Sequence, residues 1–419
     1  MRKEEKVWLD RSLLIFLTLV IMNSVKFIGI VATLGSVGKF LFCILFIAII
    51  FALVDKEKYT IQFIFEKSYF VITGLLLLFS FLFIFKTGTR ANLLPNLAFP
   101  LYFLLYYYFI KLYIRANKNN TLIDTINAVK FQILSIYRKT LFLNFIFWFI
   151  VAIGLGINMW EVDGGFGGFF QDEIHFGFYV VTGFLVSFYF RFNTTFRDLS
   201  RFNLLLLCMY GGIALFTSRN SFLIIAITLF FYFFIFKIKN RFLKVFTFFS
   251  SIILVILSII AKDLSEADII EITSGRYNIW ALAFDKITNT NYLLLGDGLF
   301  NLNDVILQNY KGVGFYYLDS LDSLSFHSSY IELLAAGGLF AVVLFVRIIS
   351  KSWISFNRVE KSMISGMLVG AMFESFLVQP FMLLASLFYF IVIINNMVIP
   401  VIKKNSKIVK LRRDFVINR

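Results

Sequence analysis

Long apolar runs separated by short polar segments recur along almost the whole chain. Residues 13–30 and 242–261 are examples, and each has about the 20 residues that a helix needs to cross a hydrocarbon core roughly 30 Å thick. The pattern predicts an all-α, polytopic integral membrane protein. It places twelve transmembrane helices at residues 12–34, 38–54, 69–85, 93–110, 141–157, 175–190, 202–217, 221–236, 243–261, 328–346, 362–378 and 380–399.

Basic residues alternate between the predicted loops in the way that sets membrane orientation. If the N-terminus is cytoplasmic, the inner segments hold 31 of the 40 Lys and Arg residues, and nine remain elsewhere. Because Lys and Arg concentrate in cytoplasmic loops, this division predicts that both termini are cytoplasmic. No small-residue cleavage site ends the first apolar run, so we expect a retained helix rather than a cleaved signal peptide.

Composition agrees with a membrane protein and excludes an ordinary soluble globule. Hydrophobic residues make up 59% of the chain and charged residues 16%, whereas average usage is about 45–50% and 25%. The net charge of +15 therefore indicates topology rather than binding of nucleic acid. Cys43 and Cys208 both fall in apolar runs, so we expect neither a structural disulfide nor a cysteine metal site.

The predicted loops suggest where function lies. Residues 262–326 form a large extracytoplasmic loop with nine acidic residues, and long loops on a rigid scaffold often carry function. Apolar residues at helical spacing predict a short helix over 277–287 within it, and an interfacial amphipathic helix in the inner segment 115–139. The predicted organisation is an N-terminal bundle of about nine helices, the loop, C-terminal transmembrane helices and a basic cytoplasmic tail, at 1–261, 262–326, 327–400 and 401–419.

Two arginines in the outer loops are candidate anion ligands. Arg219 lies in a very short connection between two apolar spans, and Arg276 immediately precedes the predicted loop helix. A guanidinium at a membrane face favours water, a partner or an anionic ligand, and its fork of donors grips phosphate oxygens. The alternatives are an interfacial anchor for Arg219 and an ion pair with a loop acid for Arg276.

The chain has two histidines, His175 and His327, both at predicted outer ends of helices. A neutral imidazole can accept a hydroxyl proton as a general base, although a histidine that caps a span is often structural. Glu332 follows His327 by five residues and is not expected to be its partner. Glu374 lies in a predicted span, where an ionisable group indicates either function or a buried hydrogen bond between helices. His175, Glu332 and Glu374 are therefore candidate accessory residues.

Several common catalytic motifs are missing from the sequence. It has no phosphate-binding loop with a Gly-Lys-Ser/Thr ending, no His-Glu-x-x-His, no Cys-x-x-Cys and no Asp-x-Asp pair in an outer loop. We therefore expect no metal and no cofactor, and the sequence does not favour an ATP-driven mechanism.

Three short motifs, in order, carry a resemblance to a known family. They are residues 217–220; residues 274–276 with Trp280 and then 295–298; and residues 327–334 with 337–339. These motifs resemble those of the O-antigen polymerase and O-antigen ligase superfamily of bacterial envelope glycosyltransferases. The resemblance implies a GT-C-like architecture of ten to fourteen spans in the bacterial cytoplasmic (inner) membrane, with one long extracytoplasmic loop and no required metal.

The resemblance also implies roles for individual residues. Arg219 and Arg276 would hold the diphosphate of an undecaprenyl-linked oligosaccharide, and His327 would deprotonate the attacking sugar hydroxyl. Positive charge at a departing diphosphate agrees with this chemistry. In the family the histidine is often followed by asparagine, whereas Ser328 follows it here.

The resemblance implies a metal-independent polymerase of lipid-linked repeat units into O-antigen or capsular polysaccharide, which is the commoner member of the family. Its expected partners are membrane lipids, a chain-length regulator and a flippase, with no nucleic acid. A ligase that transfers glycan to the lipid A core has the same motifs and stays open. A flippase or other multi-span transporter would use a similar scaffold, but the sequence has no internal repeat or midplane charge pair. A scaffold without chemistry is the remaining alternative.

Overall fold

The computed structural model describes residues 2–25, 27–56, 93–117, 122–161, 165–170, 172–193, 197–238, 276–288, 292–310 and 324–397. These residues form helices, and their β-structure is limited to one isolated bridge between Trp160 and Phe166. The predicted spans at 69–85 and 243–261 and the tail 401–419 lie outside the described residues.

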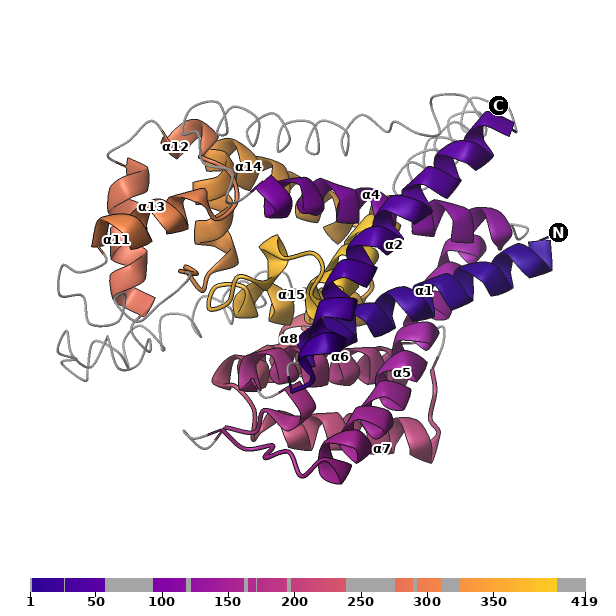
Figure 1. Cartoon of the computed structure of the whole chain (residues 1–419). Coiled ribbons are helices and arrows are strands. Elements are labelled where there is room, and N and C mark those ends of the chain that lie inside the picture. The colour runs from indigo at the N-terminus through magenta and orange to yellow at the C-terminus, as the bar shows by residue number, and fades with distance from the viewer. Residues whose placement is uncertain are drawn as a thin grey trace.

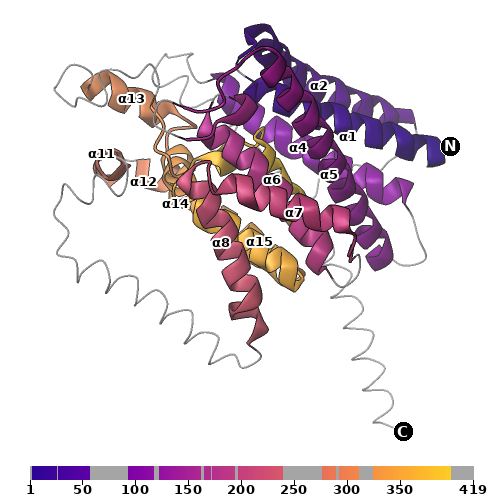
Figure 2. The same cartoon turned by 90° about the horizontal axis from the view of Figure 1, so that it is seen from below.

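Within the described ranges the fold is a bundle of helices with a group of short helices at one side (Figures 1 and 2). The bundle contains α1 (Arg2–Ser24), α2 (Gly29–Lys56), α4 (Leu93–Ala116), α5 (Leu122–Gly154), α6 (Glu173–Phe192), α7 (Arg201–Ala214), α8 (Arg219–Phe233), α14 (Ser329–Trp353), α15 (Arg358–Gly370) and a last helix, Leu383–Met397. The short helices are α11 (Arg276–Thr288), α12 (Tyr292–Leu295) and α13 (Asn301–Tyr310), with 3₁₀ turns η2 (Gly168–Phe170), η3 (Ile235–Lys237) and η4 (Phe376–Val378).

Six of these helices are long and apolar enough to cross a membrane, which makes the chain a membrane protein. They are Glu4–Ser24, Gly29–Ile49, Asp124–Gly154, Glu173–Phe192, Arg219–Lys237 and Ser329–Trp353. The predicted helices at 93–110, 175–190, 221–236 and 328–346 are confirmed as helices, as is the loop helix predicted at 277–287. The total of twelve spans and the orientation stay predictions.

The boundary between the first two predicted spans is wrong by about ten residues. α1 ends at Ser24 and α2 begins at Gly29, so the break does not fall between 34 and 38. Gly35 instead lies inside α2, where any side chain would collide with the backbone of Asn23 in α1. This glycine therefore allows two membrane helices to approach closely, as small residues do in such interfaces.

The amphipathic segment predicted at 115–139 and the span predicted at 141–157 form one continuous helix, α5. The apolar stripe of its first half, which includes Ile126, Val129 and Ile133, is buried within the protein. Lys130 on the same segment bonds Glu360 of α15 at 2.9 Å and Asn395 of the last helix at 2.7 Å. The segment therefore packs against other helices, and the prediction of a separate interfacial helix is wrong.

The last two predicted spans, 362–378 and 380–399, are also corrected. α15 has 13 residues, and the last helix, Leu383–Met397, is one of the shorter apolar helices. At 1.5 Å per residue, α15 is about 20 Å long, shorter than a hydrocarbon core of about 30 Å. Residues 371–382, which we call the tip, join the two helices and contain η4. Irregular backbone of this kind is tolerated at membrane depth where protein surrounds it, and most of residues 374–380 are buried.

The short outer helices dock on a kink in α14. Gly338 has a φ of 62° and interrupts the helical backbone. Two backbone N–H groups of the loop, those of Asp297 and Gly298, donate to the carbonyl oxygens of Ala335 and Ala336 at 2.8 and 2.9 Å. The loop thereby occupies carbonyl groups at the kink that would otherwise lack partners.

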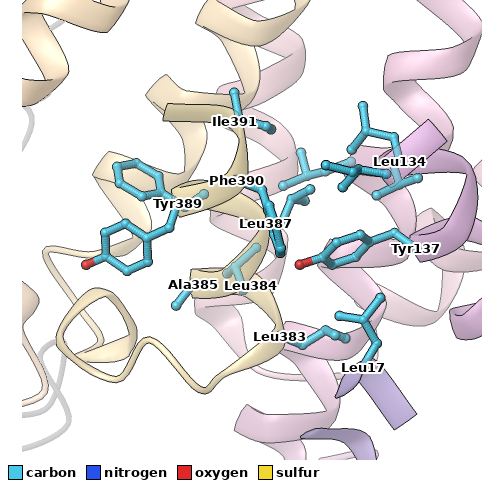
Figure 3. Close-up of a cluster of buried hydrophobic side chains, with 14 of the residues drawn as sticks. Leu17, Leu134, Tyr137, Leu383, Leu384, Ala385, Leu387, Tyr389, Phe390 and Ile391 are labelled. Carbon is cyan, nitrogen blue, oxygen red and sulfur yellow. The ribbon is translucent and has the colours of Figure 1, made fainter. Parts of the chain in front are cut away.

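Large aromatic side chains fill the centre of the bundle. Figure 3 shows Tyr137 of α5 beside Leu387 and Phe390 of the last helix, with Leu17 of α1 below them. The Tyr137 hydroxyl pairs with the Ser386 hydroxyl at 2.7 Å. Buried rings of this size contribute much apolar contact area, provided that their hydroxyl groups find partners.

Candidate functional site

Three residues that are far apart in the sequence meet beside the tip. Arg276 begins α11, His327 lies two residues before α14 begins, and Glu374 lies in the tip. Arg276 Nη2 donates to Glu374 Oε1 at 2.6 Å, and His327 Nδ1 lies 3.4 Å from Glu374 Oε2. The two carboxylate oxygens thus face different partners, and we call these residues the Arg–Glu–His cluster.

The Glu374 main chain is fixed by the start of α14. Both the backbone N–H and the hydroxyl of Ser329 donate to the Glu374 carbonyl oxygen, at 3.2 and 2.7 Å. The same hydroxyl accepts a bond from the Leu377 N–H at 3.1 Å. Ser329 therefore holds both sides of the tip around Glu374, whose side chain is only 7% exposed.

Glu374 was expected within a helical span, and that placement is wrong. α15 ends at Gly370, and Glu374 lies in irregular backbone four residues later. The alternative of a hydrogen bond between helices does not describe its contacts, because its partners belong to the outer loop and the start of α14. Among the described residues, the ion-pair partner of Arg276 is Glu374 rather than an acid of the loop.

His327 adopts a left-handed backbone with a φ of 49°, a region that residues other than glycine seldom occupy. Its backbone N–H donates to the Ser325 hydroxyl at 3.2 Å. The preceding residue, Phe326, accepts a bond from Trp280 Nε1 at 2.7 Å and donates its N–H to Glu332 Oε1 at 2.9 Å. The turn that presents the imidazole is therefore held by α11 and α14 together.

Glu332 is fully buried in the first turns of α14. Its Oε1 accepts bonds from Phe326 N–H and from Asn303 Nδ2 of α13, each at 2.9 Å. Among the described residues, these bonds lead to the turn and the outer helices rather than to the His327 ring. Glu332 thus supports the turn, and Asn303, which the sequence did not single out, shares that role.

Arg219 begins α8 and is exposed. Its neighbour Asn220 donates through Nδ2 to the carbonyl oxygen of Gly370 at 3.2 Å, where α15 ends and the tip begins. Asn220 thus joins the start of α8 to the base of the tip, but within the described ranges no ion pair joins Arg219 to the Arg–Glu–His cluster.

His175 lies apart from this cluster. Its Nδ1 is 2.7 Å from Asp172 Oδ2, and the other oxygen of Asp172 caps α6 by accepting the N–H groups of Ile174 and His175. The His175 ring lines a small apolar pocket of about 280 Å³ with Phe178 and Met382 among its walls. Asp172, the residue that caps α6, is therefore the partner of His175, and His175 does not contact His327.

The cluster has the chemistry to handle an anion and a proton. When the Glu374 carboxylate accepts a hydrogen bond from Nδ1–H of a neutral His327 ring, Nε2 carries no proton. Nε2 can then accept a proton from a substrate. Arg276 uses one terminal nitrogen on Glu374, and among the described residues its other N–H donors make no further bond, so they can bind an oxyanion. No group of three His, Cys, Asp or Glu side chains able to hold a metal occurs among the described residues, and a metal-independent reaction stays a prediction.

Comparison with known proteins found no match for this chain among family models, curated proteins or solved structures. The family resemblance therefore depends on the short motifs, and any function must be argued from the cluster itself.

Proposed function

We propose that this protein is a glycosyltransferase that polymerises undecaprenyl-diphosphate-linked oligosaccharide repeats on the outer face of the bacterial cytoplasmic membrane. The observation that carries the proposal is the meeting of Arg276 and His327 at Glu374. Arg276 and His327 belong to separate motifs and were expected to serve one reaction, and the carboxylate of Glu374 contacts both of them. A cation for a leaving diphosphate and a base for an attacking hydroxyl then lie in one site.

In the proposed step, a hydroxyl oxygen of the acceptor sugar forms a bond to the anomeric carbon of the donor glycan. The bond between that carbon and the diphosphate oxygen breaks, and its electron pair leaves with undecaprenyl diphosphate. His327 Nε2 takes the hydroxyl proton and later releases it to water. Arg276, together with Arg219 as the resemblance implies, stabilises the negative charge that develops on the leaving oxygen.

An apolar cleft beside the tip supports a lipid-linked substrate. It is bounded by α4, α14, η4 and the last helix, and it encloses about 630 Å³ including its open mouth. Its walls include Phe99, Leu333, Phe345 and Tyr389, and Ser329 lies on its surface. Because the Ser329 hydroxyl bonds the Glu374 main chain, an apolar chain in this cleft would run close to the cluster.

A ligase would use the same donor chemistry and differ in its acceptor, which the described residues do not distinguish. A transporter would move lipid-linked repeats without joining them, and transporters also use histidines as proton acceptors. Elongation of lipid-linked repeats by the purified protein therefore separates transfer chemistry from transport.

The test is to replace His327 and Arg276 by alanine in cells that make the polysaccharide. We expect correctly inserted protein, single lipid-linked repeats and no long chains, because a general base contributes about 10²–10⁴-fold to rate. The readout is the length ladder of polysaccharide on a gel.

The matched control is Arg201→Ala, which removes an exposed arginine at the start of α7 and should leave the ladder intact. A normal ladder in His327→Ala cells would show that His327 is not the base.

A further inference from the structure

We propose that Glu374 is a positioning residue that also occupies Arg276 while the site is empty and competes there with the incoming diphosphate. This inference rests on the proposed function, since it concerns the same site. It predicts that the carboxylate weakens diphosphate binding and at the same time promotes turnover.

The competition follows from the charges. The Arg276 side chain is 20% exposed and already bonded at 2.6 Å to the carboxylate of Glu374, whose side chain is 7% exposed. A diphosphate that approaches Arg276 from outside meets the same cation with the negative charge of Glu374 behind it. Like charges that share one cation repel, so the ligand binds more weakly than it would to a free guanidinium.

The carboxylate has little freedom to withdraw. Its main chain accepts two bonds from Ser329, and Leu377 is tied to the same hydroxyl. Arg276, in contrast, is attached to a helix of the outer loop by a long side chain. Arg276 therefore makes the adjustment when diphosphate binds, and Glu374 stays beside His327.

The positioning role follows from the number of acceptor oxygens. As a carboxylate, Glu374 accepts from Arg276 with one oxygen and from His327 with the other. A glutamine at this position has one acceptor oxygen and one NH₂ group. The charged guanidinium keeps the oxygen because charge-assisted hydrogen bonds are stronger, so the NH₂ group faces His327. The ring must then accept at Nδ1 and carry its proton on Nε2, the wrong tautomer for a base.

Binding is measured on the full chain in lipid nanodiscs with undecaprenyl diphosphate as the probe. Glu374→Gln should bind the probe about fivefold more tightly than wild type, the size expected when one partly exposed ion pair is removed. Arg276→Ala should bind the probe more weakly than wild type. When Glu374→Gln is added to Arg276→Ala, the affinity for the probe should not increase. Turnover of Glu374→Gln should fall about 10–100-fold, as when the residue that orients a histidine is lost.

The outcomes separate the two proposals. If Arg276→Ala weakens binding but Glu374→Gln binds no more tightly than wild type, the competition is overturned and the proposed function stands. If wild type prefers the probe no more than phosphatidylglycerol, both proposals fail.

A second measurement tests the positioning role without substrate. Since the chain has two histidines, ¹⁵N-histidine NMR gives the signals of two imidazoles. The His175→Gln variant shows which of them belong to His327. Wild-type His327 should carry its proton on Nδ1, and in Glu374→Gln the proton should move to Nε2. Unchanged His327 signals would overturn the positioning role. If Glu374→Gln fails to fold, Glu374→Asp is the second variant, because it keeps the negative charge on a shorter side chain. In Glu374→Asp, His327 should no longer carry its proton on Nδ1, while the affinity for the probe should stay near that of wild type.

Discussion

The backbone of His327 shows how much structure supports one imidazole. Its φ of 49° belongs to the sparsely populated conformations that cost about 1–3 kcal/mol and persist where neighbours hold them. Here Ser325 accepts the His327 N–H, and Glu332 fixes the preceding residue. A side chain used only to end a loop would not need such support, so the strain favours a functional role.

Ser329 offers a test of the tip at the same scale. Ser329→Ala removes one bond to the Glu374 carbonyl oxygen and one from the Leu377 N–H. We expect it to lower the free energy of unfolding by about 1–3 kcal/mol, the size for buried groups left unpaired, and to reduce polymer length.

Thermal unfolding of the purified protein and the polysaccharide ladder measure the two effects. The matched control is Ser362→Ala, because among the described residues the hydroxyl of this buried serine bonds only a carbonyl within α15. Equal behaviour of the two variants would contradict the role given to Ser329.

Sequence reasoning could name the members of the cluster but could not join them. Arg276 and His327 were singled out by their place in the outer loop, and Glu374 by its charge in an apolar run. The contact between Arg276 and Glu374 spans 98 residues, and no local periodicity encodes such a separation. Asn303 and Ser329 escaped attention because small polar residues in loops and helix caps are common.

At the scale of elements, the contact between the outer loop and α14 depends on two glycines. Gly296 and Gly338 have φ values of 67° and 62°. A side chain at Gly338 would collide with the Leu294 carbonyl group, and one at Gly296 would collide with the Ala336 carbonyl group. Asn96 of α4 also holds the loop, because its Nδ2 donates to the Leu299 carbonyl oxygen and its Oδ1 accepts a bond from the Leu299 N–H.

We expect Gly338→Ala to release the outer helices from α14 and thereby to move Arg276 away from Glu374. The measurement is limited proteolysis, in which cleavage at Lys286 should become faster and polymerisation should fall. Gly212→Ala in α7 is the control, because a side chain there meets no atom of the described residues within 4 Å. Unchanged proteolysis in Gly338→Ala would contradict the docking role of the kink.

Most described helices follow from hydropathy, and the exceptions have physical reasons. Gly35 looks like a helix end in the sequence but serves as a packing contact in α2. The tip was predicted as helix because its residues are apolar, yet Ser329 provides backbone partners that replace helical bonds. α5 was divided in two because its first half is basic, although Lys130 is paired with Glu360 inside the protein.

For the whole molecule, the membrane bundle and the outer helices form one packed unit in the described residues. Ile279 and Ile287 of α11 share an apolar cluster with Ile306 of α13 and Ile331 of α14. The +15 charge serves mainly to predict the orientation in the membrane, while Arg276 pairs with Glu374 of the tip. The molecule thus combines an apolar scaffold with a small polar site where loop and membrane helices meet.

The proposed polymerase is tested most directly by reconstitution of the purified chain in liposomes with undecaprenyl-diphosphate-linked repeats, without ATP and with a chelator. The account predicts a ladder of growing glycan chains and release of undecaprenyl diphosphate for wild type, and neither for His327→Ala. No elongation by folded wild-type protein, or equal elongation by His327→Ala, would contradict it.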